Sequence, residues 1–288
     1  MTRPSYSDPN RREFLEVVGA LMGTIALPGP NALHDDLTTK KIGPIGLQLY
    51  TVRDEMKKNV ATTLSRVART GYTEVEFAGY FDHSAKDIRS QLKNTGLSAP
   101  AAHVGFPVLG REWDKIIEDA VVVGHKYLVC PWIDDKYRTV SGYKEVAELF
   151  NKAGEQTKKA GIQFAYHNHD FEFPAVDGVI PYDLLITQTD PDKVKMEMDV
   201  FWVTHGGADP LAYFKRFPGR FPLLHVKDMD GTPAKGMVDV GKGVINWRAV
   251  LGSRSLAGTK HIFVEHDQPK DPFASIRDSY RYLHALDV

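Results

Sequence analysis

The sequence has a single cysteine, Cys130, among its 288 residues. One thiol excludes an internal disulfide framework and a multi-cysteine metal cluster, so any bound metal would be held mainly by His, Asp and Glu. Neither charge is in excess, because 36 Lys and Arg stand against 37 Asp and Glu, for a formal net charge of −1. This balance argues against nucleic acid as a partner, since binding it requires a basic surface. No apolar run reaches the roughly 18 residues that a membrane-spanning helix needs.

The composition that remains is typical of a folded protein. Hydrophobic residues make up 42% and charged residues 25%, which is ordinary for a globular chain and excludes general disorder. The length fits one large domain or two small ones, and (β/α)8 barrels reach it as one. Since no linker or low-complexity stretch divides the chain beyond its first segment, we expect one domain over residues 42–288.

The first segment has the features of an export signal. Arg11-Arg12 and Phe14-Leu15 precede an apolar run from Val17 to Leu27. A basic start followed by a short apolar stretch is typical of such signals, and the paired arginines resemble the twin-arginine type. We interpret residues 1–32 as a twin-arginine-type signal, which predicts export to the periplasm. The alternative is a helix that packs on the body of a cytoplasmic protein.

Apolar β-type runs alternate with helical runs from residue 45 onward. The predicted strands are Ile45–Thr51, Thr73–Ala78, Ala99–Val104, Tyr127–Trp132, Gln163–His169, Val194–Val200, Leu223–Lys227 and Ile262–Glu265. The predicted helices between and after them are Val60–Thr70, Ala85–Thr95, Glu112–Val123, Lys144–Lys159, Tyr182–Gln188, Pro210–Arg216, Trp247–Gly252 and Pro272–Ala285. Several of these helices are followed by glycine, which ends a helix because it enters the left-handed backbone region without a Cβ clash.

This alternation predicts parallel strands joined by helical crossovers. Eight such units match a closed (β/α)8 TIM barrel, an α/β fold. The alternative is an open doubly wound sheet, which usually carries a glycine-rich phosphate loop after its first strand. Here residues 50–55, which follow the first strand, read Tyr-Thr-Val-Arg-Asp-Glu and contain no glycine. We therefore favour the barrel.

Polar side chains gather at the predicted strand ends. They are Gln48, Glu76, His103, Trp132, His167, His169, Asp199, His225, Lys227 and Glu265. Each alone has an ordinary explanation, such as a helix cap, a buried histidine or an ion pair. Together they indicate a site, because barrel strands end in one pocket and buried ionisable groups are costly unless they pair or bind something. Asp199, His225 and Glu265 form an O/N/O ligand set, which predicts one divalent ion: Mn²⁺, Zn²⁺, Co²⁺ or Mg²⁺.

Six segments of the predicted barrel form a recognisable pattern. They are Gly46–Thr51, Val75–Tyr80, Tyr166–Phe173, Met198–Trp202, His225–Asp228 and Val264–His266. In order and spacing they resemble the sugar phosphate isomerase/epimerase family. This family belongs to the xylose-isomerase-like TIM barrel superfamily, which also contains the AP endonuclease branch. The resemblance runs from about Ile45 to the C-terminus.

The resemblance implies a divalent ion held by Glu, Asp, His and Glu from strands five to eight. Asp199, His225 and Glu265 match the last three positions. At the first position many members have Glu-Asn-His, whereas this chain has His-Asn-His at 167–169. The fourth ligand is then either His167 or Glu172, and we favour Glu172 because it restores a second carboxylate. In the family's epimerases two metal-bound glutamates act as acid and base on opposite faces of the substrate, so a histidine here changes the proton transfer or the reaction.

The resemblance also implies proton abstraction next to a carbonyl, through a metal-bound enediolate. We expect an isomerase or epimerase that acts on a sugar or keto-sugar. The alternative is a dehydratase or lyase, which loses a β-substituent from a keto-sugar glycoside or a cyclitol. A sugar-binding barrel without turnover and an AP-endonuclease-like phosphodiesterase are further alternatives, and the balanced charge disfavours the phosphodiesterase.

Individual roles follow from this chemistry. Proton transfer is predicted for Glu265. It is also predicted for His167 and His169, since imidazole titrates near neutral pH. Lys227 is predicted to stabilise the enediolate oxygen. Substrate contacts are predicted for Glu76, His103, Trp132, Trp202 and His205. The predicted partner is a small-molecule carbohydrate without phosphate, because no basic glycine-rich loop other than residues 241–243 is present. The sequence is compatible with a homo-oligomer.

Overall fold

The computed structural model describes residues 41–109 and 113–288. The predicted signal at residues 1–32 lies outside these ranges, so export stays a prediction. Glu112, at the start of one predicted helix, also lies outside them. Within the described ranges, no helix has both the length and the apolar character needed to cross a bilayer.

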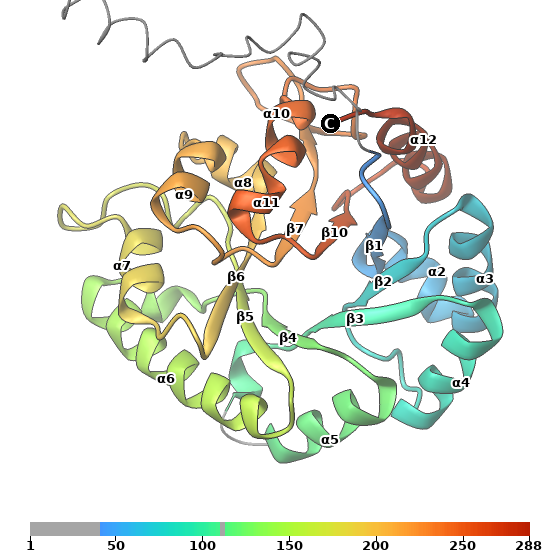
Figure 1. The fold of residues 1–288 in the computed structure, drawn as a ribbon, viewed down its shortest axis with the longest axis horizontal. Coiled ribbons are helices and arrows are strands. Elements are labelled where there is room, and N and C mark those ends of the chain that lie inside the picture. Colours follow the sequence, from blue (N-terminus) through green and yellow to red (C-terminus); the bar gives the residue numbers. More distant parts are fainter. Residues whose placement is uncertain (1–40, 110–112) are drawn as a thin grey trace, which may run out of the picture. The chain divides into compact units, whose positions relative to one another are not determined.

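Eight parallel strands close into a barrel, which confirms the predicted (β/α)8 fold (Figure 1). Around the ring they are β1 (Gly46–Gln48), β10 (His261–Val264), β7 (Leu223–Val226), β6 (Val194–Asp199), β5 (Gln163–His167), β4 (Tyr127–Cys130), β3 (Ser98–His103) and β2 (Glu74–Phe77). Strand β1 pairs with both β2 and β10, which closes the ring. The C-terminal ends of all eight strands therefore lie at the same end of the barrel.

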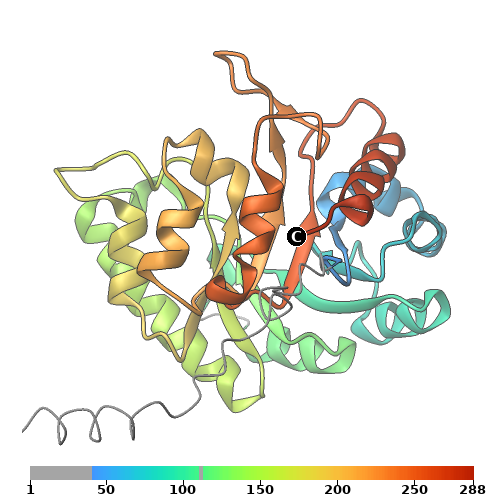
Figure 2. The same ribbon diagram turned by 45° about the horizontal axis from the view of Figure 1, so that its top comes forward.

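Helices surround the barrel on its outer side (Figures 1 and 2). They are α2 (Arg53–Lys58), α3 (Val60–Thr70), α4 (Ala85–Thr95), α5 (Trp113–Val123), α6 (Val140–Lys159), α7 (Pro181–Gln188), α8 (Val200–His205), α9 (Pro210–Arg216), α10 (Trp247–Gly252), α11 (Arg254–Ala257) and α12 (Pro272–Ala285). Helix α4 illustrates why the predicted bounds of α3, α4, α9, α10 and α12 agree with the structure. Ser84 forms a capping box with Asp87 before its first turn, and Gly96 ends it at a φ of 73°.

Most strands are shorter than predicted, because side chains at their ends turn the chain. At the end of β1, the Gln48 side chain accepts a hydrogen bond from the Tyr50 backbone N–H at 3.0 Å. The chain then enters a short 3-10 turn, Leu49–Val52. At the end of β5, Glu172 accepts from the His169 backbone N–H at 2.9 Å. Both turns move polar residues out of the strands and onto the rim of the barrel.

Helices α2, α8 and α11 and one hairpin were not predicted from the sequence. Helix α8 follows β6 with no loop between them, because Asp199 both ends the strand and caps the helix. A two-stranded antiparallel hairpin, β8 (Asp228–Met229) and β9 (Met237–Val238), lies outside the barrel sheet. The loop that joins its strands extends beyond the rest of the described chain in Figure 2.

A small apolar layer closes the inside of the barrel. Its members are Ala101, Val129, Ala165, Leu223 and Phe263, all completely buried. Because strand side chains alternate with a period of two, the residue two positions further along each strand faces the same interior, one layer closer to the C-terminal end. Those positions carry His103, Pro131, His167, His225 and Glu265. Four of the five are ionisable, so the fold gathers ionisable groups at the C-terminal end of the barrel, above the apolar layer.

Candidate active site

Asp199, at the end of β6, lies beside His225, one of these ionisable groups. Its Oδ1 accepts a hydrogen bond from the Trp202 N–H at 3.0 Å and so caps α8. Its backbone is fixed by Asn168, whose Oδ1 accepts from the Asp199 N–H at 3.1 Å and whose amide donates to the Asp199 carbonyl at 3.2 Å. The register of β6 and β7 then sets Asp199 opposite His225. Only Oδ2 of the carboxylate is left free to face the interior.

Three donor atoms from neighbouring strands converge around that oxygen. They belong to His167, His225 and Glu265, and with the Asp199 oxygen they form a set of four that all lie within 4.8 Å of one another. His167 Nε2 is 3.2 Å from Asp199 Oδ2 and 3.2 Å from His225 Nδ1. His225 Nδ1 is 2.8 Å from Glu265 Oε2. Ligands bound at about 2.1 Å to one ion lie about 3–3.5 Å apart, so two imidazole nitrogens and two carboxylate oxygens at these separations fit a divalent ion.

Glu172, the other predicted fourth ligand, is not part of the cluster. It is completely buried. One carboxylate oxygen accepts a hydrogen bond from the Tyr166 hydroxyl, and the other accepts from the His169 backbone N–H. Burial raises the pKa of Glu172 to about 8. The structure therefore brings His167, rather than Glu172, to the fourth position and uses Glu172 to hold the turn after β5.

A second layer of charged groups lies beneath the cluster. His225 Nε2 is 2.6 Å from Glu76 Oε2 and 3.2 Å from Glu197 Oε2. Gln48 donates to the same Glu76 oxygen at 2.8 Å, and His103 Nε2 is 2.8 Å from Glu197 Oε2. Because a ligand histidine commonly donates its other N–H to a carboxylate, Glu76 is placed to keep a proton on Nε2 and leave Nδ1 free for an ion.

This position does not fit the predicted direct contact of Glu76 with substrate, because the side chain is completely buried under His225. Glu197 was not predicted at all. The available signal was its spacing, since it lies two residues before Asp199 and shares its face of a strand that is otherwise buried. A charged residue at such a position is costly unless it is paired.

Lys227 lies against the cluster and is almost completely buried. Its ammonium is 3.0 Å from Asp199 Oδ2, 2.7 Å from Glu265 Oε2 and 2.9 Å from Asp267 Oδ1. Burial alone would lower the pKa of Lys227, but these three carboxylates raise it well above its ordinary value. Burial would likewise raise the pKa of Asp199, but Lys227 and His167 hold it to about 2. The site thus holds a fixed positive charge beside ionised carboxylates.

His167, at the end of β5, and His169, in the turn that follows, both favour the neutral form. Burial and the neighbouring His225 lower the pKa of His167 to about 4. Burial and His167 lower the pKa of His169 well below its ordinary value. The His169 Nδ1 atom is buried and makes no hydrogen bond within the described chain. A neutral imidazole keeps one ring nitrogen unprotonated, and such a nitrogen can accept a proton where it meets the substrate.

A cavity of about 520 Å³ opens over the cluster. Of the predicted residues, His103, Trp132, His167, His169, Lys227 and Glu265 line it. Three predicted substrate contacts do not: Glu76, Trp202 and His205. Trp202 packs against His169 with ring centroids 5.5 Å apart, and His205 pairs with Asp170 at 2.9 Å. Lys242, the one basic residue of the 241–243 loop, pairs instead with Asp239 and Asp278 on the outer surface.

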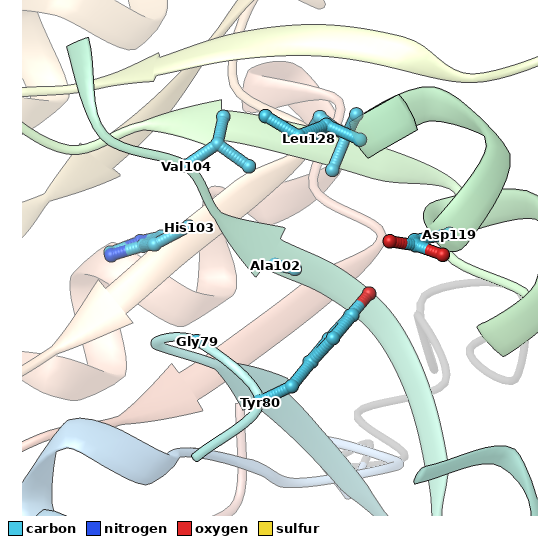
Figure 3. A pocket seen from close by; sticks show the side chains of 8 residues that line it. Gly79, Tyr80, Ala102, His103, Val104, Asp119 and Leu128 are labelled. Atoms are coloured by element: carbon cyan, nitrogen blue, oxygen red, sulfur yellow. The ribbon is translucent and has the colours of Figure 1, made fainter. Parts of the chain in front are cut away.

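A smaller hollow of about 180 Å³ lies between the barrel and α5. Figure 3 shows Tyr80 and Asp119 on one side of β3, while the His103 side chain points away to the other side. Tyr80 is held there by its hydroxyl, 2.9 Å from Nε2 of the buried His125. The ionisable group of His103 thus serves the larger cavity, and we assign no function to the smaller one.

Comparison with known proteins gives consistent relationships. The sequence profile of the xylose isomerase-like TIM barrel family matches residues 64–286. The structure of a sugar phosphate isomerase/epimerase from Parabacteroides distasonis is 30% identical, covers 84% of this chain and 98% of its own, and superposes with a TM-score of 0.75. A structure of the IolI protein with a bound zinc atom has 16% identity and a TM-score of 0.67, over 83% of this chain and 95% of its own, and shares the fold.

The curated relatives include enzymes named inosose dehydratase. That of Lacticaseibacillus casei is 33% identical over 174 residues, 53% of this chain and 57% of the relative. That of Geobacillus kaustophilus is 23% identical over 192 residues, 58% of this chain and 61% of the relative. The chain thus spans little more than half the length of the curated relatives it matches.

Proposed function

Because the chain belongs to the xylose isomerase-like TIM barrel family, we propose that it removes a proton next to the carbonyl of a keto-sugar or keto-cyclitol, with a divalent ion held by its cluster. The observation that carries this proposal is the convergence of four donor atoms within 4.8 Å, in a cluster of which two residues, His167 and Glu265, line the cavity. His167, Asp199, His225 and Glu265 would hold the ion. When bound, it would polarise the substrate carbonyl and make the adjacent C–H more acidic.

The residues around the cluster have complementary roles in this proposal. His169 lines the cavity as a neutral base and accepts the proton from carbon. Lys227 carries a fixed positive charge and stabilises the oxygen on which negative charge develops. His103 faces the cavity from β3 and orients a substrate hydroxyl. Glu265 belongs both to the donor set and to the cavity wall, so it is the second group placed to exchange a proton.

We propose loss of a β-substituent as the outcome. The electron pair of the broken C–H bond forms a C=C bond while the β C–O bond breaks, and the departing oxygen takes a proton. Two observations favour this outcome over epimerisation. Glu172, the carboxylate that would have restored the acid–base pair of the epimerases, is bonded to Tyr166 outside the cluster. The curated relatives named above are dehydratases.

Epimerisation or isomerisation is the second candidate, since the Parabacteroides distasonis relative covers more of the chain than the dehydratases do. Incubating the metal-loaded protein with an inosose and with keto-hexoses in D₂O separates the outcomes. Elimination gives an unsaturated or dehydrated product detectable by mass spectrometry. Epimerisation gives a product of unchanged composition carrying one carbon-bound deuterium. No deuterium uptake and no product from any keto compound would contradict proton abstraction altogether.

A further inference from the structure

The cavity walls carry two exposed aromatic side chains whose position the proposed reaction does not use. Among the described residues, seven large hydrophobic side chains are exposed, and only Tyr50 and Trp132 are aromatic, each 42% exposed. Both line the cavity over the cluster. Exposed aromatic rings in a cavity wall are typical of sites that bind a ring-shaped ligand by stacking.

Trp132 packs against His169, on the side away from the cluster. From the cluster outward, ring centroids are separated by 4.6 Å from His225 to His167, 5.0 Å from His167 to His169, and 4.8 Å from His169 to Trp132. A single sugar ring with its reacting carbon at the cluster would lie against His169. The Trp132 ring would then contact a second ring attached to the first.

The Trp132 side of the cavity is rigid. The Arg138 guanidinium carbon lies 4.5 Å from the Trp132 ring centroid and 3.5 Å from that of Phe171. The same guanidinium donates to the Ile133 carbonyl at 3.2 and 3.1 Å. Phe171 packs edge-on to Trp132 with centroids 5.1 Å apart. A ring that is already immobilised loses little freedom when a ligand stacks on it, which favours binding.

Tyr50 is supported in the same way on another wall. Arg53 lies 4.0 Å from its ring centroid and donates to the carbonyls of Tyr50 and Asp267, each at 2.8 Å. Tyr50 follows β1 and Trp132 follows β4, and four strands separate β1 from β4 on one side of the ring and two on the other. The two aromatic side chains therefore rise from different sides of the cavity and give it room for more than one sugar.

The charges of the wall favour a neutral second ring. Lys227 is the only Lys or Arg in the lining, and its ammonium already contacts three carboxylates. Glu265 and Asp267 line the cavity as well. A phosphorylated sugar would meet these carboxylates, and the lining offers no other Lys or Arg to bind it. Beside Trp132 an uncharged ring meets aromatic and imidazole surfaces, and the Arg138 guanidinium that lies against Trp132 is already paired with Asp135.

We infer that the substrate is a glycoside: a keto-sugar unit at the cluster joined to a second, uncharged ring that stacks on Trp132. This inference rests on the proposed function for the keto-sugar unit, but the second-ring subsite can be tested without turnover. The probes are unoxidised and unreactive: methyl β-glucoside, phenyl β-glucoside and cellobiose. The phenyl compound and cellobiose distinguish an aromatic second ring from a second sugar.

Affinities for the metal-loaded full chain would be measured by calorimetry or ligand-observed NMR. At least one two-ring probe should bind about tenfold more tightly than methyl β-glucoside. Trp132→Ala should reduce that advantage to about threefold or less and leave methyl β-glucoside binding nearly unchanged, while Trp132→Phe should retain part of it. Leu256→Ala, which truncates an equally exposed side chain on α11, is the matched control and should change nothing.

Equal binding of all three probes would overturn the subsite, as would a Trp132→Ala variant that weakens methyl β-glucoside as much as the two-ring probes. These results are distinct from a failure of the proposed reaction. A preference for two-ring probes without deuterium exchange into any keto-glycoside would support the subsite and contradict the enolising reaction. Exchange at equal rates into methyl and phenyl keto-glycosides would support the reaction and overturn the subsite.

Discussion

His225 Nε2 lies 2.6 Å from Glu76 Oε2, on the side of the imidazole ring opposite the four-donor cluster. Both side chains are completely buried. The contact fixes the ring orientation and holds a proton on Nε2, so that an ion bound in the cluster would replace the proton on Nδ1, which lies 2.8 Å from Glu265 Oε2. A residue expected to touch substrate thus controls the chemical form of a proposed metal ligand.

The Glu76→Gln variant should bind a divalent ion at least about tenfold more weakly, because the substitution removes the negative charge that stabilises the proton on His225 Nε2. Competition with a fluorescent chelator measures this affinity. Glu74→Gln is the matched control: the residue lies two positions earlier on the same strand and pairs with His261, away from the cluster. Equal metal affinity in Glu76→Gln and the wild type would show that this contact has no influence on the site.

The identity of the fourth ligand can be resolved with two substitutions. His167→Ala should lose most metal binding, since it removes one of four converging donors. Glu172→Gln should keep it, since Glu172 contacts Tyr166 and the His169 backbone instead. His167→Glu introduces the carboxylate that the family resemblance implies at this position and should bind the ion again. The opposite pattern, with metal lost in Glu172→Gln and kept in His167→Ala, would reverse the assignment.

Lys227→Met should separate catalysis from metal binding. The ammonium lies within 3.0 Å of carboxylate oxygens of Asp199 and Glu265 and competes with an ion for them. We therefore expect metal affinity to stay equal or rise. Turnover should fall about a hundredfold or more, because the charge that stabilises the developing oxyanion is gone. Steady-state kinetics and metal titration on the same preparation test both parts, and unchanged turnover would remove Lys227 from the mechanism.

The buried carboxyl group of Glu172 should make the free energy of unfolding depend on pH. Burial raises its pKa from 4.5 to about 8 in the folded chain. Between these values the folded protein retains a proton that the unfolded chain has released, so stability decreases as pH rises through this window. Relative to Glu172→Gln, the wild type should lose up to about 4 kcal/mol between pH 4.5 and pH 8. Urea unfolding of both proteins at several pH values measures the difference, and a constant difference would contradict the assigned environment.

Much of the fold follows from local sequence signals. The bounds of α4 were predictable because Ser84, Asp87 and Gly96 each act within one helical turn. The strand ends were less predictable, since Gln48 and Glu172 fold back on the backbone and shorten β1 and β5. Hydrophobic pattern alone does not show that a polar side chain has turned the chain.

The site was predictable as a group but not in its internal contacts. Asp199, His225 and Glu265 were expected together because barrel strands end in one pocket. Whether His167 or Glu172 completes the set depends on how the chain turns after β5, which spacing does not define. Glu197 was missed because its partners, His103 and His225, come from distant parts of the sequence.

The most direct test of the account is the metal content of the full chain purified without chelator, compared with Asp199→Asn. The asparagine Oδ1 can still accept from the Trp202 N–H and preserve the cap of α8, while its amide replaces a donor oxygen in the cluster. Elemental mass spectrometry should find about one divalent ion per wild-type chain and almost none in the variant. No ion in the wild type, and no thermal stabilisation by added Mn²⁺ or Zn²⁺, would contradict the metal site and the reaction proposed for it.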